Sequence, residues 1–534
     1  MGEDSIFIKK TMMVSHSHRS FLTTCLLILA GLSLNAQEPV PAAGSSSPIL
    51  HSKWITYNKE HRLVYTPDSN GNRIPDFSMA GYHDGNDPLP AYPTVITLTP
   101  SGGDDTRQIL DALDEIGKRL ADARGIRGAI LLKKGNYSVS STIEVRTSGV
   151  IIAGEGNGEE GTVIRYTATR QSSLFHVRGT GKIERMGTER KVRDSYTPVG
   201  SLTLRLTSVE GLSAGDPILV YRPATPEWIH AIYMDSIKDL PKDGKNWTPE
   251  EYGLNYERII VSIDKQHQSI ELNAPLVMPL DQRYGGGSIV KYSFPGRVRE
   301  VGFADLRMLS TYDSATDEQH GWDAILFSQC EQSWVKKVSS VHFGYSCVHV
   351  GESSKNISIL NSQCLDPISQ IIGGRRYSFN IDGQLNLVKD CYARHGRHDY
   401  VTGARVCGPN VFVHCLSDSA HDDSGPHHRW ATGTLFDNIV TDGTINVQDR
   451  GRLGTGHGWS GAWQVLWNCK ARDAIVQNPP LARNWNIGFK GKKGGRPWVK
   501  GREEGEWEAW NMPGSLDPAS LYEAQWAERR KKGQ

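Results

Sequence analysis

The feature that most constrains the fold is a strand-like segment that recurs through the second half of the chain. Each copy is short and apolar and is followed by a polar turn; the copies are residues 357–364, 387–391, 412–415, 435–439 and 466–469. Successive copies end 27, 24, 24 and 30 residues apart, a period typical of a solenoid, in which each coil covers its apolar face with its neighbours. The pattern therefore predicts an all-β coil of stacked parallel strands with the recurring Cys and aliphatic side chains pointing inward.

Residues 95–156 have the order expected at the start of such a coil. Asp105 is a plausible N-cap, and apolar residues follow it at helical spacing: Ile109, Leu110, Leu113, Ile116 and Leu120. Strand-like segments follow at residues 129–137 and 150–156. A helix, a strand ending in Gly-Asn-Tyr and a strand ending in Gly-Glu-Gly resemble the first coil of pectate-lyase-like right-handed β-helices. The resemblance covers most of residues 95–480. It implies a single-stranded right-handed parallel β-helix with an N-terminal capping helix.

The chain divides into four parts. Residues 1–36 have the form of a signal peptide, with Lys9, Lys10 and Arg19 before an apolar run and small residues before Gln37. A lead-in at 37–94 precedes the β-helix at 95–483, which carries a β-rich insertion at about 200–297, and an extension at 484–534 contains a docking helix capped by Asp517. We therefore expect a secreted or periplasmic protein with no stable membrane span in the mature chain.

Composition excludes several classes of protein. The formal net charge of +1 argues against nucleic acid as a partner, although a local basic groove is compatible with it. Outside the predicted signal peptide seven cysteines remain, an odd number without any CxxC pair, so neither a dense disulfide framework nor a zinc–thiolate site is expected. We expect a monomer.

Three clusters of His, Arg and Asp lie between the recurring segments. The first contains Arg397 and His398, the second contains Asp422, Asp423, His427, His428 and Arg429, and the third contains His457. The steps from Arg397 to Arg429 and from Arg429 to His457 are 32 and 28 residues, close to one coil each. Stacked coils would bring these groups side by side on one face.

The residue types in these clusters suit β-elimination from a uronic acid. That reaction needs a group that neutralises the carboxylate, a base for the adjacent proton and an acid for the leaving oxygen. Arg clamps carboxylates through its planar fork, and a neutral His among cations can serve as the base. We therefore predict a polysaccharide lyase acting on an acidic polysaccharide. The candidate catalytic residues are Arg397, His398, His427, His428, Arg429 and His457; the candidate substrate-binding residues are Arg375, Arg376, Trp430 and Trp459; and Asp422 and Asp423 are candidate calcium ligands, with no other cofactor expected.

Two alternatives remain open at this point. A glycoside hydrolase would need two carboxylates roughly 5–10 Å apart, for which Asp422, Asp423 and Asp449 are candidates. Asp422-Asp423 and Gly456-His457-Gly458 faintly resemble motifs of polygalacturonase-type hydrolases, but their Asn-Thr-Asp and Arg-Ile-Lys motifs are missing. A non-catalytic carbohydrate-binding protein is the second alternative, because the superfamily contains lyases, hydrolases and binding proteins on one scaffold.

Overall fold

The structure is a computed structural model that describes residues 48–86 and 88–532. The predicted signal peptide and residues 37–47 of the lead-in lie outside the described residues. Among the helices that are described, none combines the length and the apolar character needed to cross a membrane.

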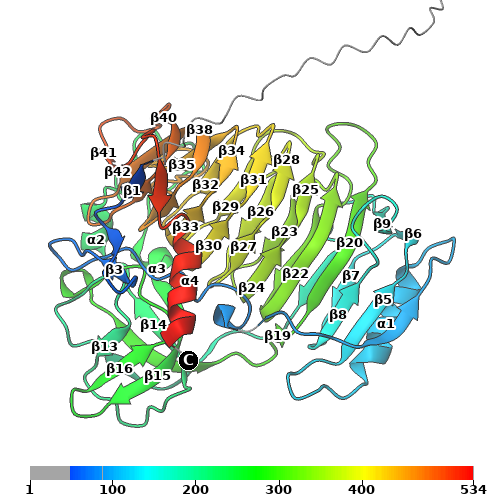
Figure 1. Cartoon of the computed structure of the whole chain (residues 1–534), viewed down its shortest axis with the longest axis horizontal. Coiled ribbons are helices and arrows are strands. Elements are labelled where there is room, and N and C mark those ends of the chain that lie inside the picture. The colour runs from blue at the N-terminus through cyan, green and yellow to red at the C-terminus, as the bar shows by residue number, and fades with distance from the viewer. Residues whose placement is uncertain (1–47, 87, 533–534) are drawn as a thin grey trace, which may run out of the picture. The chain divides into compact units, whose positions relative to one another are not determined.

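The strands of successive coils pair in parallel and form three ladders, which together make the predicted right-handed parallel β-helix (Figure 1). The first ladder consists of β4 (Thr94–Leu98), β5 (Gly128–Leu132), β8 (Val150–Ala153), β20 (Gly302–Ser310), β22 (Cys330–Val341), β24 (Lys355–Leu360), β27 (Leu387–Lys389), β30 (Cys407–Val413), β33 (Ala431–Asp437), β37 (Val465–Trp467), β39 (Trp485–Ile487) and β42 (Glu506–Glu508), with β19 (Val298–Arg299) and β36 (Gly461–Ala462) beside it. The second consists of β6 (Gly135–Val139), β9 (Thr162–Tyr166), further residues of β20 and β22, β25 (Gln363–Leu365), β28 (Tyr392–Arg394), β31 (Leu416–Asp418), β34 (Val440–Thr441), β38 (Lys470–Asn478) and β40 (Lys490–Lys493). The third consists of β7 (Ile143–Val145), β10 (Phe175–Arg178), β21 (Asp323–Ser328), β23 (Ser346–Val350), β26 (Tyr377–Ile381), β29 (His398–Thr402), β32 (Asp423–Pro426), β35 (Thr444–Val447) and the later part of β38.

The inner faces of the three ladders share one apolar core. The recurring positions Cys364, Cys391, Cys415, Ile439 and Cys469 all belong to it, and none is more than 2% exposed. Among the described residues all seven cysteines are buried free thiols. The predicted inward stack is therefore confirmed.

The helix α1 (Thr106–Gly117) covers the first coil (Figure 1). Its residues Ile109, Ala112, Leu113 and Ile116 pack into the same core, so the open end of the solenoid is closed by an amphipathic helix. The helix ends at Gly117, and Leu120, which the spacing had placed on its apolar face, is 94% exposed.

A separate antiparallel sheet interrupts the coil between β10 and β19. Its order is β11-β18-β14-β15-β16-β13, which corresponds to the β-rich insertion expected at about 200–297 and begins somewhat earlier. The insertion contains β11 (Glu184–Lys191), β12 (Tyr196–Thr197), β13 (Thr203–Arg205), β14 (Pro217–Arg222), α2 (Pro226–Ala231), α3 (Pro249–Tyr252), β15 (Leu254–Asp264), β16 (Ser269–Leu272), β17 (Leu280–Asp281) and β18 (Ser288–Ser293). The segment around α2 and α3 contributes Trp228 and Trp247, whose rings pack edge-on against Trp430 of the coil.

The coil continues past residue 483, the predicted end of the β-helix. Strands β39, β40 and β42 add to the ladders, because Trp485, Ile487 and Phe489 keep the inward apolar pattern. Beyond them the chain forms β41 (Glu503–Glu504), β43 (Ser515–Asp517) and the helix α4 (Leu521–Lys532); near the start of the described chain lie β1 (Ile49–His51), β2 (Ile55–Tyr57) and β3 (Leu63–Tyr65).

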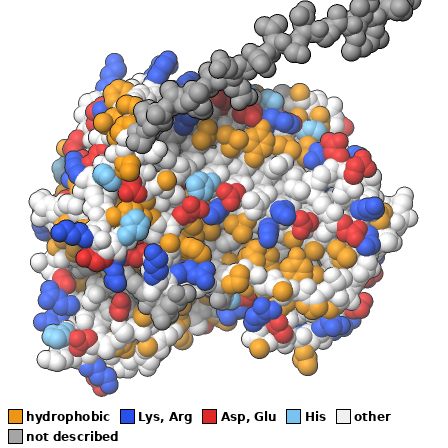
Figure 2. All heavy atoms as spheres, viewed as in Figure 1, with side chains coloured by type: hydrophobic (Ala, Val, Ile, Leu, Met, Phe, Trp, Pro, Cys, Tyr) orange, Lys and Arg blue, Asp and Glu red, His pale blue; other side chains and the backbone are white. Residues whose placement is uncertain are grey.

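The C-terminal helix docks on the coil, as expected, but starts later than predicted. Asp517 does not cap it, since β43 pairs with β1 and the helix begins at Leu521. The buried Asp437 accepts hydrogen bonds from Ser520 Oγ and Tyr522 N, each at 2.8 Å, which fixes the first turn of the helix. On the face shown in Figure 2, Lys and Arg side chains are interspersed with Asp and Glu, in keeping with the small net charge.

Candidate functional site

Four histidines converge on the outer side of the third ladder, and we name them the histidine cluster: His398, His427, His428 and His457. The ring centroid of His427 lies 4.5 Å from that of His398, 5.2 Å from that of His428 and 5.3 Å from that of His457. The His428 and His457 centroids are 4.9 Å apart. His398 begins β29, His427 and His428 follow β32, and His457 lies in the loop after β35, so successive coils supply the rings.

Buried tryptophans hold the loops that carry these rings. The backbone N–H of Arg429 donates to His457 O at 3.1 Å, and that of Trp430 donates to Trp459 O at 2.8 Å. Both indoles are buried against the insertion: the Trp430 ring meets Trp228, and Trp459 Nε1 donates to Ile232 O at 3.0 Å. The insertion therefore fixes the position of His428 beside His457.

A buried ion pair lies beneath the cluster. Asp423 Oδ1 is 2.7 Å from His398 Nδ1, and Asp423 Oδ2 accepts hydrogen bonds from Asn446 Nδ2 and the Arg450 guanidinium. Burial disfavours the charged carboxylate, but the Arg450 guanidinium outweighs it, with His398 in support, and holds the pKa of Asp423 well below its usual range. Asp423 is therefore ionised and committed to its partners.

Three histidines of the cluster are neutral at neutral pH. Burial, reinforced by the neighbouring histidines and Arg450, lowers the pKa of His427 well below its ordinary value. Burial together with the same kind of cationic surround lowers the pKa of His428 to about 3 and that of His457 to about 4. The Nδ1 atoms of all three are buried and have no hydrogen-bond partner among the described residues. A neutral imidazole without a partner at one ring nitrogen, as in His428 and His457, is available to accept a proton or to bind a ligand.

Tyr377 adds a phenol to the cluster. Its hydroxyl is 3.0 Å from His427 Nε2, and burial raises the pKa of Tyr377 to about 12, against the opposing effect of the Arg397 and Arg450 charges. The phenol is therefore protonated and donates to the imidazole. Its ring stacks on Tyr345 at 5.1 Å, and Tyr345 in turn lies 6.1 Å from Trp322, so a row of aromatic rings follows the ladder up to the cluster.

All six residues predicted to be catalytic lie at or beside this cluster. Arg397 lies next to Tyr377, and its Nη2 is 3.3 Å from Asp422 Oδ2. Arg429 donates to Thr455 Oγ1 at 2.5 Å, and its charge acts on the pKa of His428 and His457. Tyr377, Asn446 and Arg450 were missed. Tyr377 is the strand partner of His398 in the preceding coil, so the pairing of the strands identifies it.

The residues predicted to bind substrate contact other parts of the chain in the structure. Arg375 is held by Glu318 through contacts of 2.5 and 2.9 Å, and Arg376 is buried and donates to Ser369 O at 2.6 Å. Trp430 and Trp459 are 1% and 0% exposed, so no ring face is open for a sugar to stack on. Their hydrophobic area is used to join the insertion to the coil.

The two carboxylates predicted to bind calcium do not converge. Asp422 is exposed and faces Arg397, whereas Asp423 is buried and faces His398 and Arg450. Among the described residues, one group of potential metal ligands comes within 4.8 Å: His398, Asp423 and His427. Calcium takes six to eight oxygen ligands, whereas this group offers two imidazoles and a carboxylate already bonded to an arginine. The residues do not fit calcium.

The carboxylates proposed for a hydrolase are also occupied. Asp449 is fully buried, 2.7 Å from Arg502 Nη2, and accepts a hydrogen bond from Gly451 N at 2.8 Å. Since Asp423 is committed to Arg450 and Asp422 to Arg397, no two of the three carboxylates form a free acid–base pair.

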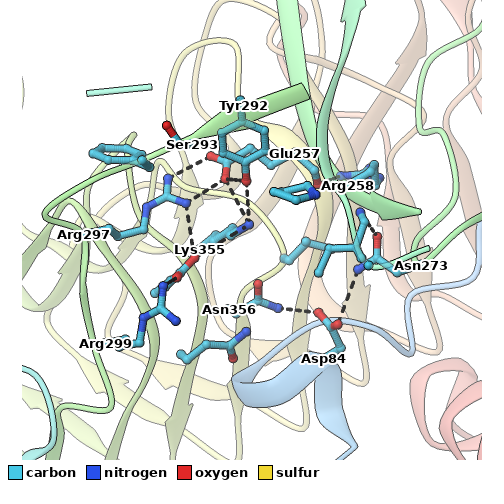
Figure 3. Close-up of a pocket in the computed structure, with 17 residues that line it drawn as sticks. Asp84, Glu257, Arg258, Asn273, Tyr292, Ser293, Arg297, Arg299, Lys355 and Asn356 are labelled. Carbon is cyan, nitrogen blue, oxygen red and sulfur yellow. Dashed lines mark hydrogen bonds and ion pairs between the residues drawn. The ribbon is translucent and has the colours of Figure 1, made fainter. Parts of the chain in front are cut away.

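A separate cavity of about 320 Å³ lies between the insertion and the coil (Figure 3). There Glu257 of β15 binds Arg297 at 2.7 and 2.9 Å, Lys355 Nζ at 3.0 Å and Tyr292 Oη at 2.5 Å. The two cations and the phenol saturate the carboxylate, and the pKa of Glu257 lies well below its usual range because they outweigh its burial. We interpret this network as a structural joint.

Comparisons with known proteins show similarity at the level of the fold. No protein-family model matches the sequence, and no curated protein matches it. The tailspike protein gp49 from Pseudomonas phage LKA1 is 14% identical with a TM-score of 0.41, over 72% of this chain and 62% of that one. The tailspike of E. coli bacteriophage HK620 in complex with a pentasaccharide is 8% identical with a TM-score of 0.40, over 86% and 62%. The catalytic domain of a GH87 alpha-1,3-glucanase in complex with nigerose is 10% identical with a TM-score of 0.35, over 80% and 67%. The chain thus spans a little over three fifths of the length of these tailspikes.

Proposed function

We propose that the protein is a polysaccharide lyase that cleaves a uronic-acid-containing polysaccharide by β-elimination at the histidine cluster. The observation that carries the proposal is the pairing of neutral imidazoles with a protonated phenol, Tyr377, among arginines. A neutral base, an acid and cations are the three components that the reaction needs. Together with the predicted signal peptide, this leads us to place the activity outside the cytoplasm.

In the proposed mechanism, arginines bind the uronate carboxylate. Arg397 and Arg429 flank the cluster from two coils, and their cationic charge favours the enolate-like intermediate that forms when the adjacent C–H bond breaks. The arriving carboxylate also offsets the cations that hold the histidine pKa values low, so the imidazole becomes a stronger base once substrate is bound.

Two groups of the cluster supply the base and the acid of the elimination. His428 or His457, the two partly exposed histidines, accepts the proton from C5. The C5 electron pair forms the C4–C5 double bond, the C4–O bond breaks, and Tyr377 gives its proton to the leaving oxygen. The new imidazolium then releases its proton to solvent and the phenolate takes one up from solvent, which restores the neutral base and the phenol.

Product analysis with cluster variants tests this proposal. On acidic polysaccharides the protein should release unsaturated, ultraviolet-absorbing ends. Tyr377→Phe and His428→Gln should fold normally, and each should lower kcat by about 100-fold or more, because a general acid or base typically contributes a rate factor of that size. His267→Gln is the matched control, because His267 is exposed and Asp264 is its only ion-pair partner in the described part of the chain. New reducing ends without ultraviolet absorbance would show that the enzyme is a hydrolase and not a lyase. Full turnover in both variants would show that the histidine cluster does not take part in the reaction.

A further inference from the structure

A second recess, which we name the basic groove, lies next to the histidine cluster. Three segments far apart in sequence line it: residues 233–239 after α2, residues 449–453 after β35 and residues 495–502 after β40. Its volume is about 1090 Å³, slightly above the range of about 300–1,000 Å³ for small-molecule pockets. It is large enough for an extended ligand.

The charge of the groove is strongly positive although the whole chain is nearly neutral. Its lining includes six cations and two carboxylates. Arg502 is paired with Asp449 and Arg450 with Asp423. The other four cations are exposed, and none of them forms an ion pair with a described residue; they are Lys238, Arg452, Arg496 and Lys500. With Asp239 as the one remaining acid of the lining, the groove keeps a net charge that suits an anionic ligand.

Two exposed aromatic rings lie among these cations. Trp498 is 49% exposed, and its backbone N–H donates to Gln448 Oε1 at 3.0 Å. Tyr233 is 52% exposed, and the Arg502 guanidinium lies 5.1 Å from its ring centroid. Large exposed rings held by their backbone or by a neighbour offer flat apolar faces at low entropic cost, which suits stacking on sugar rings.

The groove and the cluster share one loop. Residues 449–453 line the groove, and the same loop continues to His457. Gly458 N donates to Gly451 O at 2.9 Å, which folds the loop back on itself. Arg450 lines the groove, and its guanidinium reaches Asp423 beneath the cluster. The groove and the cluster therefore adjoin each other at this loop.

We propose that the basic groove binds several consecutive uronate residues of the polysaccharide that is cleaved at the histidine cluster. The four unpaired cations bind carboxylates, and Tyr233 and Trp498 stack on sugar rings. The identity of the ligand as a uronate polymer rests on the proposed lyase function, whereas its anionic and extended character rests on the groove itself. The groove makes the enzyme prefer long chains over short oligomers.

Binding measurements by calorimetry test the groove independently of turnover. The probes are short and long oligomers of galacturonate, of alginate and of a glucuronate-containing polymer, and the same oligomers after reduction of their carboxyl groups to alcohols. In a Tyr377→Phe background, Arg496→Ala/Lys500→Ala should weaken binding of the preferred long oligomer by about tenfold or more, equivalent to about 1.4 kcal/mol. Trp498→Ala should weaken it as well, and short oligomers should be affected much less.

A charge-matched control separates the groove from general electrostatics. Lys118→Ala/Arg170→Ala removes two exposed cations from the α1 end of the coil, and binding should not change. The proposal is overturned if control and groove variants lose affinity equally, if carboxyl-reduced oligomers bind as tightly as the acidic ones, or if a single-stranded oligonucleotide of equal charge binds more tightly than every uronate. If the groove variants lose affinity but no unsaturated product ever forms, the lyase proposal fails and the groove stands.

Discussion

Gly454 is a residue on which the geometry of the histidine cluster depends. It has φ +54°, and a Cβ added there would lie 2.1 Å from His457 Cε1, so any side chain must displace the imidazole. A left-handed backbone costs a non-glycine residue about 1–2 kcal/mol, and this cost is separate from the displacement of the ring.

We expect Gly454→Ala to lower kcat by about 10–100-fold with a small loss of stability, because the ring moves while the coil is kept. Gly494→Ala is the matched control, since Gly494 also has a positive φ, +82°, but an added Cβ would meet no atom of the described residues within 4 Å. Activity assays and thermal melts of both variants check this. Equal losses of activity in the two variants would assign the effect to backbone strain alone.

At the scale of elements, the joint between the insertion and the coil is an ion-pair network (Figure 3). Glu257 lies on β15 of the insertion, whereas Lys355 lies on β24 of the coil, and both are nearly buried. The insertion also packs on Trp430 and Trp459, whose loops carry the histidines. A substitution that weakens the joint should therefore also change the geometry of the histidine cluster.

We expect Glu257→Ala to reduce the free energy of unfolding by about 3–5 kcal/mol, because it leaves Arg297 and Lys355 buried without a carboxylate. Glu523→Ala removes a half-exposed partner of Lys389 and should cost less than about 1 kcal/mol. Denaturant titrations of the two variants give the comparison. A loss below 1 kcal/mol for Glu257→Ala would show that the network is not a joint.

For the whole molecule, the neutral histidines make stability depend on pH. A histidine with a folded-state pKa below its unfolded value binds fewer protons when folded, so its contribution to stability is complete above the unfolded value and is lost as the pH falls. For His457 this window runs from 6.5 down to about 4. Asp399 and Asp437, whose pKa values burial raises to about 6, act in the opposite direction.

We expect His457→Gln to flatten the dependence of unfolding free energy on pH across that window by about 1.4 kcal/mol per pH unit. The residues facing His457 are Arg429, Arg450, His398, His427 and His428, and all of them carry or can acquire positive charge. Denaturant titrations at several pH values measure the slope. A variant with an unchanged slope would mean that His457 is protonated normally in the folded protein.

The parts of the site that could be predicted are those that follow the coil period. Arg397, His428 and His457 are about one coil apart in sequence, and stacking brings them together. Tyr377 lies one coil earlier, directly after Arg375 and Arg376, and those two arginines were chosen instead of the phenol. Arg450 is 6% exposed in a position that sequence alone does not reveal. The burial of Trp430 and Trp459 depends on the insertion, which comes from a distant part of the chain.

The amino-acid sequence by itself determined the solenoid, its capping helix and the face on which His and Arg gather, because periodic burial is a local property that repeats along the chain. Tertiary structure alone decided which of those side chains remain available. The choice depends on partners from other segments: Glu318 occupies Arg375, Arg450 occupies Asp423, and the insertion covers the two tryptophans. The tertiary structure also creates the basic groove. Its positive charge comes from three loops that are far apart in sequence, and no single loop reveals it.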